Sequence, residues 1–165
     1  MKWTAEQWGA LALKYSEIYK VDAALIMAVI EQESGGNPYA IRVERGFWRR
    51  YGAAVIRNAQ ATVTSLDDKW AAYPDFAACS YGLMQILWVT AAEFGVIPQY
   101  PTELCDPETN IDAGCRKLSS CFRKAGGGRE GALLCYNGGG NPAYPGDVLA
   151  RVQRMNRSLL HVQRA

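Results

Sequence analysis

The residue of this sequence best suited to catalysis is Glu33, in the stretch LIMAVIEQESGGNP. Asp22 is suited to cap a helix, and apolar residues follow it at helical spacing: Leu25, Ile26, Val29 and Ile30. Glu33 comes three positions after the last of these, so it continues the apolar face of the helix, and Gly35 and Gly36 end the helix behind it. Burial and the negative end of the helix dipole both favour the protonated carboxyl, which is the form that a general acid needs.

The same pattern also has a plainer interpretation. A glutamate near a helix end is more often solvated or paired with arginine, so periodicity alone leaves a structural role for Glu33 open. Glu31 lies two positions away, about 200° around a helix. The two carboxylates therefore do not face each other, and we expect Glu31 at the surface rather than in a catalytic pair.

The composition is typical of one soluble globular domain. The chain has 165 residues, of which 49% are hydrophobic and 21% charged. The net charge of +2 is too small to indicate a nucleic-acid partner, and no apolar run is long enough for stable insertion into a membrane. The N-terminus, MKWTAEQWGA, lacks the apolar core of a signal peptide. We therefore expect synthesis in the cytosol, or a signal removed before residue 1.

The five cysteines are an odd, scattered set without a CxxC pair, and His161 is the single histidine. This argues against a disulfide framework and a structural zinc site, and we predict no metal or cofactor. The main expectation is thiols that stay reduced, with one or two disulfides after export as the alternative.

The periodic segments predict an all-α domain of about seven helices over residues 1–165, with glycine breaks at 35–36, 126–128 and 138–140. Asp106-Pro107 marks the start of one helix, and Pro145-Gly146-Asp147 starts the last. Residues 39–80 are the least regular part, with a helix expected over 48–59, a short element near Trp70 and at most a minor β-hairpin. Their segment IRVERGFWRR could line a sugar-binding groove or form a local core with solvated arginines.

Three segments together resemble the signature blocks of the soluble type of lytic transglycosylase, a family related in fold to goose-type lysozyme. They are Glu33-Ser34 with Asn37-Pro38, then Gly82-Leu83-Met84-Gln85-Ile86, and then Tyr136-Asn137-Gly138-Gly139. The segment Asp106-Pro107 with Asn110-Ile111 and Gly114 is similar to the helix that this family has between its second and third blocks. The resemblance runs from about Leu25 to Arg157 and implies a lysozyme-like fold.

The resemblance also implies roles for individual residues. The catalytic glutamate of the family matches Glu33, and its tyrosine beside that glutamate matches Tyr136. The residues that it places in the sugar groove match Ser34, Met84, Gln85, Ile86 and Asn137. Asn137 could equally satisfy a turn, and Met84 could equally fill the core.

The sequence departs from the family pattern in two places. Residues 39–80 form an insertion where the family has a short loop, and this insertion includes Glu44, a possible auxiliary carboxylate. Cys135 stands where a small residue usually precedes the tyrosine.

The reaction that the resemblance implies is cleavage of the β-1,4 bond between N-acetylmuramic acid and N-acetylglucosamine in peptidoglycan. A single glutamate would act first as acid and then as base, and the product would be a 1,6-anhydromuramic end. Two alternatives stay open: a hydrolytic muramidase in which Glu44 or Asp75 positions water, and a non-catalytic glycan-binding module.

The resemblance also suggests where the protein acts. A small wall-cleaving enzyme without a signal peptide resembles a bacteriophage endolysin, held in the host cytoplasm until its release to the cell wall. We expect a monomer whose partner is the glycan strand. The arginines of the last helix could approach an anionic wall, although our main expectation is an ordinary solvated helix face.

Overall fold

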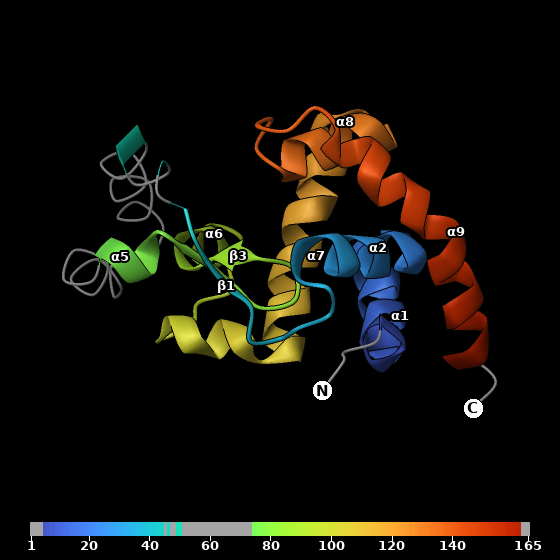
Figure 1. Ribbon diagram of the computed structural model, residues 1–165, viewed down its shortest axis with the longest axis horizontal. Coiled ribbons are helices and arrows are strands. Elements are labelled where there is room, and N and C mark those ends of the chain that lie inside the picture. Colours follow the sequence, from blue (N-terminus) through green and yellow to red (C-terminus); the bar gives the residue numbers. More distant parts are fainter. Residues whose placement is uncertain (1–4, 45, 47–48, 51–73, 163–165) are drawn as a thin grey trace.

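The computed structural model describes residues 5–44, 46, 49–50 and 74–162, and Figure 1 shows their arrangement. Seven α-helices have described bounds: α1 (Gly9–Tyr19), α2 (Ala23–Ser34), α5 (Pro74–Ala77), α6 (Trp88–Glu93), α7 (Pro107–Lys124), α8 (Arg129–Tyr136) and α9 (Tyr144–Val162). Two 3₁₀ helices, η1 (Ala5–Trp8) and η2 (Pro101–Cys105), precede α1 and α7. The prediction of a mainly helical domain with about seven helices is confirmed.

Much of the segment 39–80 lies outside the described residues. This applies to Phe47 and Trp48, to the helix expected over 48–59 apart from Arg49 and Arg50, and to the element near Trp70. None of the described helices has the length and apolar character that crossing a membrane requires.

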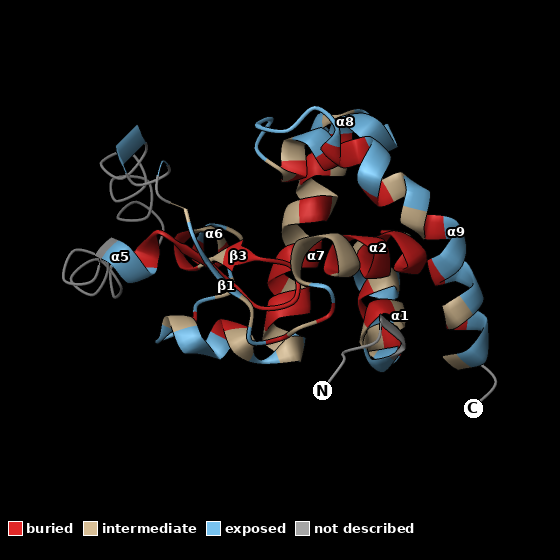
Figure 2. Cartoon of the chain, viewed as in Figure 1, coloured by how far each residue is buried: buried red, intermediate tan, exposed pale blue. Residues whose placement is uncertain are grey.

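Helix α2 lies at the centre of the core. It packs against α1 and α9, and α7 packs against α1 and α8 (Figure 1). Every residue from Ala23 to Ile30 is buried, so the expected amphipathic helix is in fact apolar on all sides over these positions (Figure 2). The side chain of Asp22 accepts a hydrogen bond from the backbone N–H of Ala24 at 3.0 Å, and Gly35 ends the helix with φ +62°. Both predicted ends are confirmed.

A small antiparallel sheet lies beside the helical core, with the strand order β1 (Ile41–Val43), β2 (Cys79–Tyr81) and β3 (Ile86–Leu87). Its first two strands form the minor β-pairing that was expected inside the 39–80 segment. The third strand lies beyond that segment and was not predicted. The turn between β2 and β3 depends on positive φ angles, which the apolar sequence of this segment does not indicate. Gly82 has φ +73°, and Gln85 has φ +50°, which reverse the chain.

Helix α7 holds that turn in place through Asn110. The amide Nδ2 donates to the carbonyls of Tyr81 and Leu104 at 2.8 Å, and Oδ1 accepts from the N–H of Met84 at 2.7 Å. A Cβ atom on Gly114 would come within 2.3 Å of the Sδ of Met84, so only glycine leaves room for this side chain. The segments Gly82–Ile86 and Asn110–Gly114 are therefore linked by packing.

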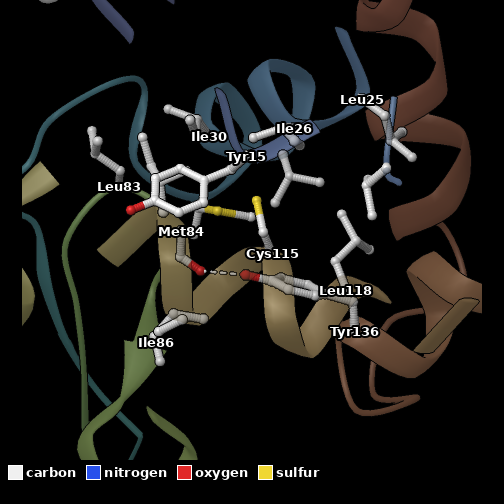
Figure 3. Packing of buried hydrophobic residues seen from close by; sticks show 14 of the residues in the cluster. Tyr15, Leu25, Ile26, Ile30, Leu83, Met84, Ile86, Cys115, Leu118 and Tyr136 are labelled. Atoms are coloured by element: carbon white, nitrogen blue, oxygen red, sulfur yellow. Dashed lines mark hydrogen bonds between the residues drawn. The ribbon is translucent and has the colours of Figure 1, made fainter. Parts of the chain in front are cut away.

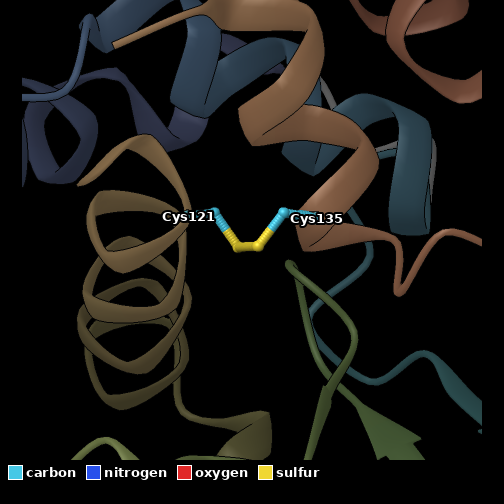
Figure 4. Close-up of a disulfide and its surroundings, with 2 residues drawn as sticks. All are labelled: Cys121 and Cys135. Atoms are coloured by element: carbon cyan, nitrogen blue, oxygen red, sulfur yellow. A yellow bond between two sulfur atoms is a disulfide. The ribbon is translucent and has the colours of Figure 1, made fainter. Parts of the chain in front are cut away.

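Helix α7 begins as predicted, because the side chain of Asp106 accepts from the N–H of Thr109 at 2.8 Å and Pro107 follows it. Near its other end Cys121 forms a disulfide with Cys135 of α8 (Figure 4). The main expectation of reduced thiols is therefore wrong for this pair, and the alternative of one bridge holds. Periodicity could not reveal the pairing, because it depends on how α7 and α8 pack. The remaining thiols are free, with Cys79 and Cys115 buried and Cys105 half-buried.

Candidate active site

Glu33 lies in the last turn of α2, where the helix leaves the core. Its side chain is only 8% exposed. The hydroxyl of Tyr144, the first residue of α9, donates to its Oε1 at 2.6 Å, and Nη2 of Arg42 lies 4.0 Å from its Oε2. Glu33 is therefore a nearly buried carboxyl with one close donor and one more distant cation.

The environment raises the pKa of Glu33 above its usual value of 4.5. Desolvation is the largest cause. The hydrogen bond from Tyr144 and the positive charges of Arg42 and Lys117 oppose the shift, and the charge of Glu44 adds to it. The direction of the shift agrees with the expectation from the sequence, and it favours the form that donates a proton.

Glu33 opens into a pocket of about 450 Å³, a size within the range of small-ligand sites. One side, here called the helical wall, comes from α2, α7 and α8 and includes Glu33, Lys117 and Tyr136. The other side, here called the strand wall, comes from the sheet and the residues next to its strands: Arg42, Glu44, Ser80, Gln85 and Leu87. Asn137 and the glycine-rich segment behind α8 complete the rim.

The strand wall is a connected polar network. Oε1 of Glu44 accepts from Nε of Arg42 at 2.7 Å and from Oγ of Ser80 at 3.2 Å. The single hydroxyl proton of Ser80 is shared between Oε1 of Glu44 and the closer Oε1 of Gln85, at 2.9 Å. Nε2 of Gln85 donates to the carbonyls of Ala40 and Gly82 at 3.0 Å. The predicted residues Gln85 and Glu44 therefore do lie in the pocket, and both are held by neighbours in its wall.

Two of the residues predicted to bind sugar face the protein interior instead, and a third, Ser34, is half-buried and hydrogen-bonded to the backbone. Met84 and Ile86 are completely buried in the core (Figure 3). Oγ of Ser34 donates to the carbonyl of Leu83 at 2.8 Å, which fixes the end of α2 to the turn before β3. The side chains of Ser34, Met84 and Ile86 do not line the pocket. Among the residues of the turn before β3, only Gln85 lies in its wall. The core interpretation of Met84 is the one that the structure supports.

Tyr136 lines the pocket, but its hydroxyl donates to the backbone carbonyl of Met84 at 2.8 Å (Figure 3). Oδ1 of Asn137 accepts from the N–H of Asn141 at 2.9 Å, as the turn interpretation expected. The tyrosine that contacts Glu33 is Tyr144, which the sequence analysis missed. A signal for it existed, because Tyr144 precedes Val148 by one helical repeat on the buried face of α9.

Lys117 is a second pocket residue that the sequence analysis missed. Its Nζ lies 4.4 Å from the centroid of the Tyr136 ring, in cation–π geometry. Desolvation lowers the pKa of Lys117, while the charges of Glu33, Glu93 and Glu44 oppose that shift. The sequence gave no signal that Lys117 would line a pocket. A lysine next to the apolar residue Leu118 is common at the edge of the apolar face of a helix.

The two other acidic residues considered in the sequence lie outside the pocket. Glu31 forms ion pairs with Arg151 at 3.5 Å and with Arg154 at 2.5 Å. It is half-buried rather than fully at the surface, and these contacts give two arginines of α9 a structural role. Asp75 lies on α5 and is exposed.

This geometry is a pocket of about 450 Å³ with one nearly buried carboxyl, which fits an acid-catalysed cleavage. Comparison with known families agrees: residues 10–144 match the family described as the Transglycosylase SLT domain. The chain therefore belongs to this family of lytic transglycosylases, enzymes that cleave peptidoglycan. No solved structure gives a significant match to the chain.

Proposed function

We propose that this protein cleaves the β-1,4 bond between N-acetylmuramic acid and N-acetylglucosamine with Glu33 as its single acid and base. The observation that carries the proposal is the desolvated carboxyl of Glu33, which has a raised pKa and faces a pocket of about 450 Å³ lined by polar side chains. The strand wall supplies polar side chains that can hold sugar hydroxyl and acetamido groups.

The first step is proton donation by Glu33 to the glycosidic oxygen. The bond from that oxygen to the anomeric carbon of muramic acid breaks, and positive charge develops at this carbon. The acetamido oxygen of the same sugar then bonds to the anomeric carbon in place of an enzyme nucleophile. Tyr144 is a positioning residue for this step, because its hydrogen bond fixes Oε1 of Glu33.

The second step uses Glu33 as a carboxylate. It removes the proton from the 6-hydroxyl of muramic acid, and the oxygen attacks the anomeric carbon and displaces the acetamido oxygen. The products are a 1,6-anhydromuramic end and a free 4-hydroxyl on the leaving sugar. Glu33 regains its proton, and no water is consumed.

A hydrolytic reaction is the second candidate, because Glu44 lines the same pocket as Glu33. A water held by Glu44 would attack the anomeric carbon and give a reducing muramic end. The ion pair with Arg42 argues against this role, since it occupies an oxygen of Glu44 that a general base would use.

Mass spectrometry of the fragments released from purified peptidoglycan separates the two candidates. The single-glutamate reaction predicts fragments lighter by one water than hydrolytic products, without reducing muramic ends. Reducing ends that disappear in Glu44→Gln would establish the hydrolytic reaction instead. A protein that binds glycan and releases nothing would overturn both and leave a binding module.

We also propose that the protein acts as an endolysin in the host of a bacteriophage. The proposal rests on the family activity, since an enzyme that cleaves peptidoglycan lyses a cell once it reaches the wall. Expression in a bacterial host tests it: lysis should require co-expression of a pore that opens the inner membrane. Lysis at the same rate without the pore would contradict this role.

A further inference from the structure

The two cations of the pocket have different partners. Arg42 is paired with Glu44 at 2.7 Å and lies 4.0 Å from Glu33. Lys117 has no carboxylate within 4.0 Å and no hydrogen-bond acceptor among the residues that the structure describes. Its close contact is the face of the Tyr136 ring.

Lys117 is half-buried, and its ammonium is open to the pocket. It carries three N–H donors, and a ring face compensates only part of the lost hydration. The lowered pKa of Lys117 has the same cause, since desolvation outweighs the nearby glutamates. The two oxygens of Glu33 already face Tyr144 and Arg42. Lys117 is therefore the pocket cation that can take an oxygen ligand without breaking an ion pair.

Peptidoglycan offers one anion close to the sugar ring that is cleaved. Muramic acid bears a lactyl group on its ring, and this group ends in a carboxylate when no peptide is attached and in a neutral amide when one is. The other carboxylates of peptidoglycan lie farther out, along the flexible peptide. A lysine inside the pocket is within reach of groups next to the ring, not of the distant part of a peptide.

We propose that Lys117 binds the lactyl carboxylate of the muramic acid at the cleavage site, so that the enzyme prefers glycan strands from which the peptides have been removed. This inference rests on the proposed function and deepens it, because it names the form of the substrate. The enzyme would then act after an amidase-type reaction, the class of reaction that frees this carboxylate.

The test uses three glycan substrates: strands freed of peptide, the same strands with the lactyl carboxylate converted to a methylamide, and peptide-bearing strands. The methylamide removes the charge with little added bulk, so it separates charge recognition from a steric effect of the peptide. A charge-assisted hydrogen bond is stronger than a neutral one, and we expect the wild type to favour the carboxylate over the methylamide by about tenfold in kcat/KM. Most of the difference should lie in KM.

Lys117→Met should abolish this preference. Because the charge of Lys117 also lowers the pKa of Glu33, both substrates are compared within each variant at the same pH. The matched control is Lys124→Met, an exposed lysine on the same helix, which should keep the full preference. If Lys117→Met does not fold, Lys117→Gln replaces it, because glutamine removes the charge and keeps a polar side chain. This variant should lose the preference as well.

Equal cleavage of carboxylate and methylamide by the wild type, or a preference that persists in Lys117→Met, would overturn the proposal. Failure of the folded wild type to cleave any of the three substrates would instead overturn the proposed function. The two failures are therefore distinguishable.

Discussion

The helical wall and the strand wall of the pocket each present a carboxylate, and the two are held in opposite ways. Glu33 extends from a helix that is buried over eight successive residues, and burial raises the pKa of its carboxyl. Glu44 follows a strand whose three residues are all exposed, its side chain is 31% exposed, and a guanidinium lies 2.7 Å away. The comparison teaches that the element behind a carboxyl decides its chemistry. A core helix can exclude water from one face of a side chain, whereas an exposed edge strand can only surround it with polar partners.

The largest effect should come from replacing the two carboxyls separately. We expect Glu33→Gln to lower the rate of cleavage about a thousandfold, since general acid catalysis is lost. We expect Glu44→Gln to lower it by no more than about fivefold, the worth of a solvent-exposed ion pair. Cleavage rates on one purified glycan measure both, and Glu31→Gln is the matched control on α2. Equal losses in Glu33→Gln and Glu44→Gln would mean that the walls do not differ in function.

The helical wall should also depend on its disulfide. The bond between Cys121 and Cys135 has a sequence separation of 14, and closing a loop of this size contributes about 3 kcal/mol to the free energy of unfolding. We expect Cys121→Ser to lose most of that amount in urea unfolding under oxidising conditions. Cys105→Ser, which removes a free thiol, should lose little. A reductant that leaves the wild type as stable as before would contradict a contribution from the disulfide.

Replacing Tyr144 and Tyr136 one at a time distinguishes an effect on catalysis from an effect on packing. The hydrogen bond from Tyr144 lowers the pKa of Glu33, so Tyr144→Phe should raise that pKa further. The protonated acid then persists to higher pH, and the alkaline limb of the pH–rate profile should move upward. Tyr136→Phe removes a donor from the buried carbonyl of Met84 and should cost about 1–3 kcal/mol in unfolding free energy. Its pH–rate profile should not move. A profile that moves in Tyr136→Phe but not in Tyr144→Phe would support the catalytic role predicted for Tyr136.

The smallest effect concerns the contact between the walls. The charge of Arg42 lowers the pKa of Glu33 less than the Tyr144 hydrogen bond does. Arg42→Met should therefore move the alkaline limb upward by less than Tyr144→Phe. Arg123→Met, an exposed arginine near the end of α7, should leave the limb in place. A downward shift in Arg42→Met would show that Arg42 does not act on Glu33 through its charge.

The difference between the walls also explains what the sequence could predict. The helical fold and the ends of α2 follow from periodicity and caps, which are local. The apolar face that periodicity predicts for α2 also agrees with the burial that raises the pKa of Glu33. Gln85 and Glu44 both line the pocket, and the roles predicted for them toward the substrate stay predictions.

The missed features depend on packing between distant segments. Tyr144 reaches Glu33 only because α9 crosses α2, and Met84 faces inward only because Gly114 makes room for it. The disulfide and Lys117 likewise depend on how α7 meets α8. Periodicity can mark Tyr144 as a buried position of α9, but no local pattern shows which residue it contacts, and none indicates the disulfide or the position of Lys117.

The central claim is that the helical wall keeps Glu33 protonated above the range of an ordinary carboxyl. The most direct measurement is a pH titration of its carboxyl carbon by NMR in protein labelled at glutamate, with Glu33→Gln to assign the signal. The account predicts a pKa above the usual 4.5 that rises further in Tyr144→Phe. A Glu33 that titrates at or below 4.5 would contradict it, because the pocket would then hold a carboxylate and not an acid.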